Sequence, residues 1–126
     1  VNNNAPVIRF GGKMRQGHNP KNILGDEHFT QEPGAFFELT FRGTEIVWVG
    51  SQGPWRGYAD VYIDGEKVAT VNPYAPQAKY QVELFRRSGL GSGLGDAEHT
   101  IKVVCTGEMS ADATAPFINL DAFKYQ

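Results

Sequence analysis

Cysteine is almost absent from this chain, because Cys105 is the only one among 126 residues. A single cysteine cannot form an internal disulfide, so the fold must be stabilised by an apolar core. Cys105 alternates with Ile101 and Val103, and this spacing predicts a buried strand position for the thiol rather than a nucleophile.

Long apolar runs and a strong charge of one sign are also missing. No run approaches the roughly 18 apolar residues that a membrane-spanning helix needs. A net charge of −2 leaves no basic face for nucleic acid. The hydrophobic content of 40% argues against disorder, and the length suits one domain. We therefore expect a single domain over residues 1–126, with residues 1–6 as a linker or frayed end.

The first residues contain no initiator Met and no basic segment followed by an apolar stretch. A signal peptide would need both parts of that basic-then-apolar pattern. We therefore expect a module from within a longer chain, although a processed protein would begin in the same way.

The clearest structural signal is a β-hairpin over residues 57–71. Aliphatic side chains alternate with polar and aromatic ones from Tyr58 to Ile63, which is typical of a strand with one buried face. Asp64 and Gly65 follow, and both tolerate the positive φ of a tight two-residue turn. The return run, Lys67 to Val71, is rich in β-branched residues.

The remaining sequence predicts further short strands and little helix. Apolar residues never keep helical spacing for three turns. Trp48 lies among apolar neighbours and is expected in the core, whereas residues 13–33 are expected to form a long loop with a short edge strand near residues 27–30. Strands between Gly-rich and Pro-rich loops predict an all-β antiparallel sandwich with jelly-roll connections. The expected strands cover residues 7–10, 34–41, 44–49, 80–85, 99–105 and 116–125, and in the last of these the inward face stays open.

The order of motifs from residue 34 to residue 125 resembles one known group. The motifs are Gly34-Ala-Phe-Phe, Ile46-Val-Trp-Val-Gly, Gly57-Tyr-Ala-Asp-Val-Tyr-Ile-Asp-Gly, Val71-Asn-Pro-Tyr and Leu120-Asp-Ala-Phe. Together they are similar to the galactose-binding-domain-like β-sandwiches, a superfamily that includes many carbohydrate-binding modules. The resemblance implies a non-catalytic glycan-binding domain appended to a secreted bacterial glycoside hydrolase or polysaccharide lyase. Its location would be extracellular or periplasmic, and its partners a polysaccharide or oligosaccharide and the catalytic domain of the parent chain.

Sugar binding requires an aromatic face for the C–H surface of the ring and polar groups for its hydroxyls, usually displayed on loops. Trp55 lies in a Gly-rich and Pro-rich loop and is the leading candidate, although its ring could instead fold over the sheet edge. Arg56 could bind vicinal hydroxyls or a uronate, or it could form a surface salt bridge. Tyr74 is a second loop aromatic, for which packing is the competing explanation.

The 13–33 loop offers further polar candidates, of which Arg15, Asp26 and His28 are the ligand-binding predictions. Solvated surface positions would explain these residues equally well. Related calcium-carrying modules place acidic residues near the first strand and in the last one. Asp121 matches the second of these places, so the resemblance implies it as a ligand of a structural calcium, but Val7–Phe10 supplies no carboxylate. No other cofactor is required.

Catalytic signals are weak. Glycoside hydrolysis needs two carboxylates facing each other across the scissile bond, whereas strand and turn positions explain the acids present. The Gly-rich run at residues 88–95 lacks the Lys-Ser/Thr ending of a phosphate loop. We therefore expect no enzymatic activity from this domain. The alternative to a glycan-binding module is a structural sandwich that packs against a catalytic domain without binding glycan.

Overall fold

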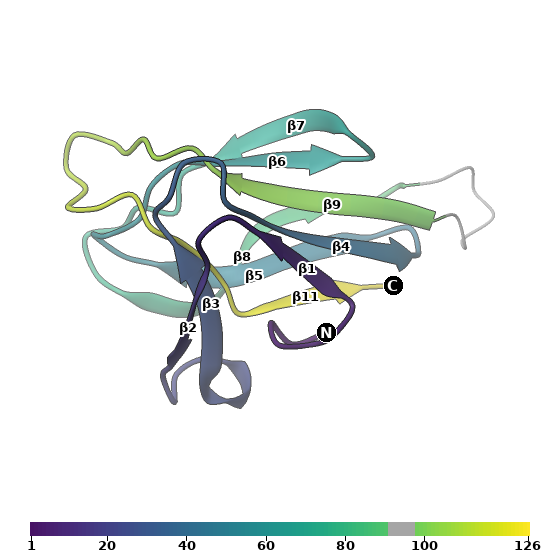
Figure 1. Ribbon diagram of the computed structural model, residues 1–126, viewed down its shortest axis with the longest axis horizontal. Helices are drawn as coiled ribbons and strands as arrows, with labels where there is room; N and C mark the ends of the chain where they lie inside the picture. The colour runs from purple at the N-terminus through teal and green to yellow at the C-terminus, as the bar shows by residue number, and fades with distance from the viewer. Residues whose placement is uncertain (91–97) are drawn as a thin grey trace.

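The computed structural model describes residues 1–90 and 98–126, and it confirms the predicted all-β class. Figure 1 shows two main layers of strands with a smaller sheet below them. The larger layer has the order β1-β4-β9-β6-β7, and the second layer has the order β11-β5-β8. A third, three-stranded sheet has the order β10-β3-β2. The strands are β1 (Ile8–Gly11), β2 (Arg15–His18), β3 (Asp26–Thr30), β4 (Phe36–Arg42), β5 (Ile46–Gln52), β6 (Ala59–Ile63), β7 (Glu66–Val71), β8 (Lys79–Arg87), β9 (Glu98–Cys105), β10 (Ile118–Leu120) and β11 (Ala122–Tyr125).

Strands β6 and β7 form the predicted hairpin. They pair antiparallel, and β6 also pairs with β9, which places it inside the larger sheet. Asp64 has φ 52° and Gly65 has φ 83°, so both turn residues adopt the left-handed conformation that this two-residue turn requires. Ala59 and Val61 are fully buried, which confirms that the aliphatic face of β6 points into the core.

The core lies between the two main layers. Phe37 from β4 packs against Trp48 from β5, with ring centroids 5.7 Å apart, and against Phe123 from β11, at 6.0 Å. All three rings are fully buried, and Cys105 is 1% exposed. The predictions of core positions for Trp48 and Cys105 are therefore confirmed. Buried aromatic rings of this size contribute a large part of the apolar area that stabilises a sandwich.

Three segments differ from expectation. Residues 1–6 do not fray, because Asn3 is fully buried and its backbone N–H donates to the Asp121 carbonyl at 3.0 Å. The 13–33 segment contains a strand that periodicity missed, β2, which pairs with β3 through its backbone and carries no apolar alternation. The expected last strand is two strands, since β10 pairs with β3 whereas β11 pairs with β5.

The Gly-rich connection expected over residues 88–95 falls largely on residues 91–97, which lie outside the described part. Among the described residues, no helix is long and apolar enough to cross a membrane. The one helical segment there is a short 3-10 turn, η1 (Ile23–Gly25).

Candidate functional site

A hollow of about 200 Å³ lies where the loop after β5 meets β3, the start of β8 and the loop before β10. The long loop that joins β9 to β10 borders this cavity, and it lies at the left of Figure 1, away from both chain ends. We call this cavity the Trp55 hollow. Its volume is smaller than the roughly 300–1,000 Å³ that is typical of pockets for drug-sized ligands, and this suits a small polar ring. It is lined by Asn19, Glu27, Phe29, Ser51, Trp55, Arg56, Tyr80 and Phe117.

Trp55 lines this hollow and remains 37% exposed. A tight loop presents the side chain, because Pro54 accepts a hydrogen bond from the Thr114 backbone at 2.7 Å and Gly53 pairs with Tyr74. The indole lies close over Gly53, where an added Cβ would stand 3.1 Å from Trp55 Cε2. The backbone therefore fixes a large aromatic ring that solvent can reach.

Arg56 lies beside Trp55, and it is buried rather than at the surface. Its side chain is 4% exposed, and its Nε donates to the Ser51 carbonyl at 3.0 Å while Nη2 donates to the Ser51 hydroxyl. Burial lowers the pKa of Arg56 to about 10, and the negative charge of Glu27 opposes that shift. The guanidinium is therefore charged at neutral pH, and it does not form the surface salt bridge that the sequence left open.

The side chains of β3 lie on two faces, and one of these faces borders the Trp55 hollow. Glu27 and Phe29 line the Trp55 hollow, whereas Asp26 and His28 do not. The His28 ring stacks on Phe10 with centroids 4.1 Å apart. Because successive strand residues point to opposite faces, the polar residues predicted for binding alternate with the ones that reach the hollow.

Asp26 and His28 instead hold the first residues of the chain. His28 Nδ1 lies 2.6 Å from Asn3 Oδ1, and burial lowers the pKa of His28. The Asp26 carboxylate accepts hydrogen bonds from the side-chain amides of Asn2, Asn3 and Asn4. The structure gives these two predicted ligand-binding residues contacts within the protein.

Arg15 and Tyr74 lie near the Trp55 hollow without lining it. Arg15 is exposed on β2 and borders a smaller neighbouring cavity of about 40 Å³, which shares Phe117 with the hollow. Tyr74 is half-buried, and its backbone pairs with Gly53 beneath the Trp55 loop. Of the six predicted ligand-binding residues, the structure thus brings Trp55 and Arg56 together in one cavity.

Sequence reasoning missed Tyr80, Phe117 and Ser51 because each belongs to, or adjoins, a run that reads as an ordinary strand. Asn19 and Glu27 stood among the polar residues of the 13–33 loop but were not selected. The alternation within residues 26–30 was the available signal, since it separates Glu27 and Phe29 from their neighbours.

Asp121 lies at the break between β10 and β11 and is fully buried. Its two carboxylate oxygens accept the Ile23 backbone N–H at 3.0 and 3.1 Å. Burial raises its pKa to about 6, and the charges of Asp26 and Glu27 add to that shift.

The described groups around Asp121 supply few of the oxygen ligands that a calcium ion needs. Calcium takes six to eight oxygen ligands, and the Asp121 and Asp26 carboxylates, whose oxygens also accept N–H donors, would supply only part of that set. Within residues 1–90 and 98–126, no cluster of three or more acidic, histidine or cysteine side chains could hold a metal. Calcium ligation by Asp121 stays a prediction that the contacts of this structure do not favour.

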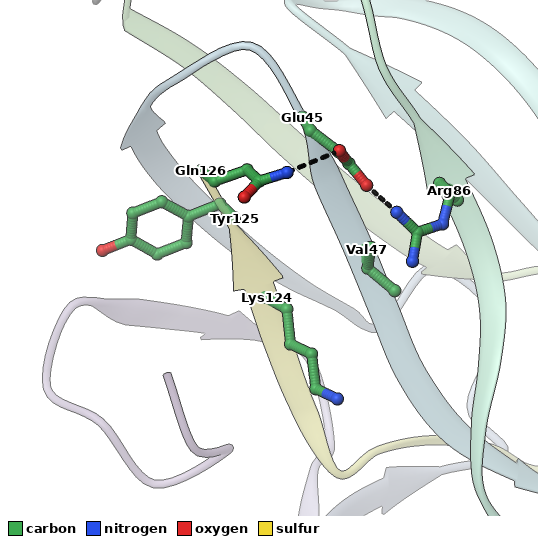
Figure 2. Close-up of a pocket in the computed structure, with 6 residues that line it drawn as sticks. All are labelled: Glu45, Val47, Arg86, Lys124, Tyr125 and Gln126. Carbon is green, nitrogen blue, oxygen red and sulfur yellow. Dashed lines mark hydrogen bonds and ion pairs between the residues drawn. The ribbon is translucent and has the colours of Figure 1, made fainter.

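A second hollow of about 200 Å³ lies beside β11 and is shown in Figure 2. Two of its charged groups contact each other: Glu45 pairs with Arg86, and it also accepts a hydrogen bond from Gln126 Nε2 at 3.0 Å. Tyr125 points away from that pair in Figure 2, and its ring packs against Phe41 with centroids 5.6 Å apart. Tyr125 is the one aromatic residue among the described residues that line this hollow, whereas Trp55, Phe29, Tyr80 and Phe117 line the Trp55 hollow, which is therefore the better candidate.

Comparisons with known proteins agree with this architecture. No family model matches the chain. It is 36% identical over 125 residues to an A type blood N-acetyl-alpha-D-galactosamine deacetylase of Flavonifractor plautii, covering 99% of this chain and 14% of that protein. It is 37% identical over 118 residues to an A type blood alpha-D-galactosamine galactosaminidase of the same organism, covering 94% of this chain and 10% of that one. The chain therefore spans only a small part of the curated relatives it matches.

A solved module of similar length superposes on this chain. A family 35 carbohydrate binding module from Clostridium thermocellum superposes with a TM-score of 0.59 at 11% identity, covering 98% of this chain and 95% of that module. At this identity the likeness concerns the fold. The resemblance drawn from the sequence is confirmed at that level, and the chain is a β-sandwich of the kind found in carbohydrate-binding modules.

Proposed function

We propose that this chain is a non-catalytic carbohydrate-binding module that holds a glycan in the Trp55 hollow. The observation that carries the proposal is the position of Trp55, a large ring that lines the hollow and is 37% exposed. Tyr80 and Phe29 line the same hollow. Aromatic walls with a few fixed polar groups are what a sugar ring requires, since its C–H face stacks on a ring and its hydroxyls need directed hydrogen bonds.

The lining does not favour catalysis. Among the described residues that line the hollow, Glu27 is the single carboxylic acid. Glycoside hydrolases use two carboxyl groups about 5–10 Å apart across the scissile bond. A site with one fixed carboxylate can bind a sugar but lacks the second group of that mechanism.

The module would act within a larger protein. Two relatives that are named as enzymes of A type blood galactosamine sugars contain a similar segment, and that segment spans 14% or less of each. The parent would be a bacterial, extracellular or periplasmic glycoside hydrolase or polysaccharide lyase. Binding would raise the effective concentration of glycan near its catalytic domain. We expect dissociation constants of about micromolar to millimolar, because a few stacking contacts must offset the cost of association.

A glycan array followed by calorimetric titration of the strongest hit tests the proposal. Replacing Trp55 with Ala should weaken binding at least about tenfold, which corresponds to about 1.4 kcal/mol, while the melting temperature stays close to that of the wild type. Tyr125→Ala is the matched control, since this ring is 43% exposed but borders the other hollow. Unchanged affinity in Trp55→Ala would refute the site. A folded chain that binds no glycan would favour a structural sandwich that packs against a catalytic domain.

A further inference from the structure

Two oppositely charged groups line the Trp55 hollow, the half-buried Glu27 and the buried Arg56. Glu27 comes from β3, and Arg56 comes from the loop after β5. Each is held by hydrogen bonds to other parts of the sandwich, so the separation between them is set by the fold rather than by a ligand.

The Glu27 carboxylate is fixed on both of its oxygens. Asn119 Nδ2 donates to Oε1 at 3.0 Å, and Asn22 Nδ2 donates to Oε2 at 3.2 Å. Both amides are buried, at 1% and 3% exposure. An ionised carboxylate has about four acceptor positions, so each Glu27 oxygen can accept one further hydrogen bond from a ligand.

The Arg56 guanidinium is fixed in the same manner. Ser51 takes the hydrogen bonds of Nε and Nη2, with its carbonyl and its hydroxyl. The Ser51 backbone N–H in turn donates to Asn119 Oδ1 at 2.9 Å. A guanidinium carries five N–H donors, so donors remain for a ligand in the hollow.

We propose that the Trp55 hollow selects an uncharged sugar ring, with Glu27 accepting a hydrogen bond from one hydroxyl and Arg56 donating to a neighbouring one. This inference rests on the proposed function. The two charges offset each other, so a uronate would gain from Arg56 but face Glu27, and a cationic amino sugar would gain from Glu27 but face Arg56. A hydroxyl both donates and accepts, so a neutral ring with vicinal hydroxyls satisfies both groups.

The remaining lining groups agree with this selectivity. Asn19 and Ser51 are uncharged, and the walls are the rings of Trp55, Phe29 and Tyr80. Lys21 lies outside the lining, with its ammonium 5.3 Å from the centroid of the Tyr80 ring. The charge inside the hollow is therefore that of the Glu27 and Arg56 pair.

The test is the charge preference of the intact chain. We would titrate the ¹⁵N-labelled protein with galactose, N-acetylgalactosamine, galactosamine and galacturonate, at about pH 6, where an amino group carries its proton. The same preparation would be applied to an array that pairs uncharged glycans with their uronate and de-N-acetylated counterparts. We expect the two uncharged sugars to bind at least about fivefold more tightly than either charged one, a difference of about 1 kcal/mol.

Glu27→Gln tests the residue that opposes anions. It should weaken the binding of uncharged sugars and move the preference toward galacturonate by about tenfold, because Arg56 would no longer be offset. Glu66→Gln is the control, since this carboxylate is exposed on β7, and it should leave the preference unchanged. The wild-type preference is decisive even if Glu27→Gln fails to fold.

The outcomes separate the two proposals. Tighter binding of galacturonate or galactosamine than of both uncharged sugars would overturn the selectivity while leaving the glycan-binding function intact. Absence of binding to every glycan and sugar would overturn the proposed function, and the selectivity with it.

Discussion

Asp121 makes the stability of this protein depend on pH in an unusual direction. Its carboxylate is fully buried and its pKa is raised to about 6, against a value of about 3.9 for an unfolded Asp. The folded protein therefore holds a proton that the unfolded chain has already lost, and stability falls as the pH rises through the interval between these values. Below about pH 4 both states are protonated, and this cost is absent.

The magnitude follows from the difference of about two pKa units. At about 1.36 kcal/mol per unit, ionising Asp121 costs the folded state at most about 3 kcal/mol above pH 7. Asp121→Asn removes the charge and keeps one oxygen that can accept the Ile23 N–H. The neutral amide oxygen makes a weaker hydrogen bond than the carboxylate, and this loss offsets about 1 kcal/mol of the gain. The variant should therefore be more stable than the wild type by about 1–2 kcal/mol at about pH 7.5.

Urea unfolding of both proteins at several values between about pH 4 and pH 8 measures this effect. The advantage of Asp121→Asn should grow with pH and level off above about pH 7. Asp112→Asn is the matched control, because Asp112 is exposed in the loop between β9 and β10, and its unfolding curve should run parallel to that of the wild type. A stability difference between Asp121→Asn and the wild type that stays constant over this range would refute the assignment.

Two further changes test the surroundings of the candidate site. Gly53→Ala should weaken glycan binding several-fold without unfolding the protein, because the new Cβ would stand 3.1 Å from Trp55 Cε2 and the ring must shift. Calorimetric titration measures the affinity and a melting curve checks the fold. Unchanged affinity would show that the position of the ring does not matter for binding. Chelation by EGTA, or addition of calcium, should leave the melting temperature unchanged, because the described residues contain no cluster of three acidic, histidine or cysteine side chains that could hold the ion. A rise of several degrees with calcium would restore Asp121 as a metal ligand.

Much of the fold was predictable because most strands bury one face. The hairpin of β6 and β7 and the buried thiol of Cys105 follow from period-two alternation, and the core position of Trp48 follows from its apolar neighbours in β5, which is buried on both faces. Strand β2 was not predictable in this way. Its residues are exposed or half-buried, and it is a strand because its backbone pairs with β3. Periodicity detects burial, so an edge strand without a buried face leaves little signal.

The candidate site was predictable only in part, because side chains alternate between the two faces of β3 and the sequence does not show which face meets the hollow. Trp55 and Arg56 could be selected because a breaker-rich loop leaves a large ring without a core partner. In β3, neighbouring residues lie on opposite faces: Glu27 lines the hollow, whereas Asp26 and His28 contact the first residues of the chain. A shift of one position exchanges the two faces of a strand, and the short run of residues 26–30 carries polar groups on both.

Asn119 is the residue that connects the core to the candidate site. It lies between the fully buried Ile118 and Leu120 and is itself 1% exposed. Its carbonyl accepts Trp48 Nε1 at 3.0 Å, while its side chain joins the Ser51 backbone to Glu27. Buried amides are satisfied in native structures, so an Asn within an apolar strand already indicates that one of its faces meets polar groups. The same contacts mean that the Glu27 and Arg56 pair is positioned by the packing of β10 against β5, which prepares the site before any ligand binds.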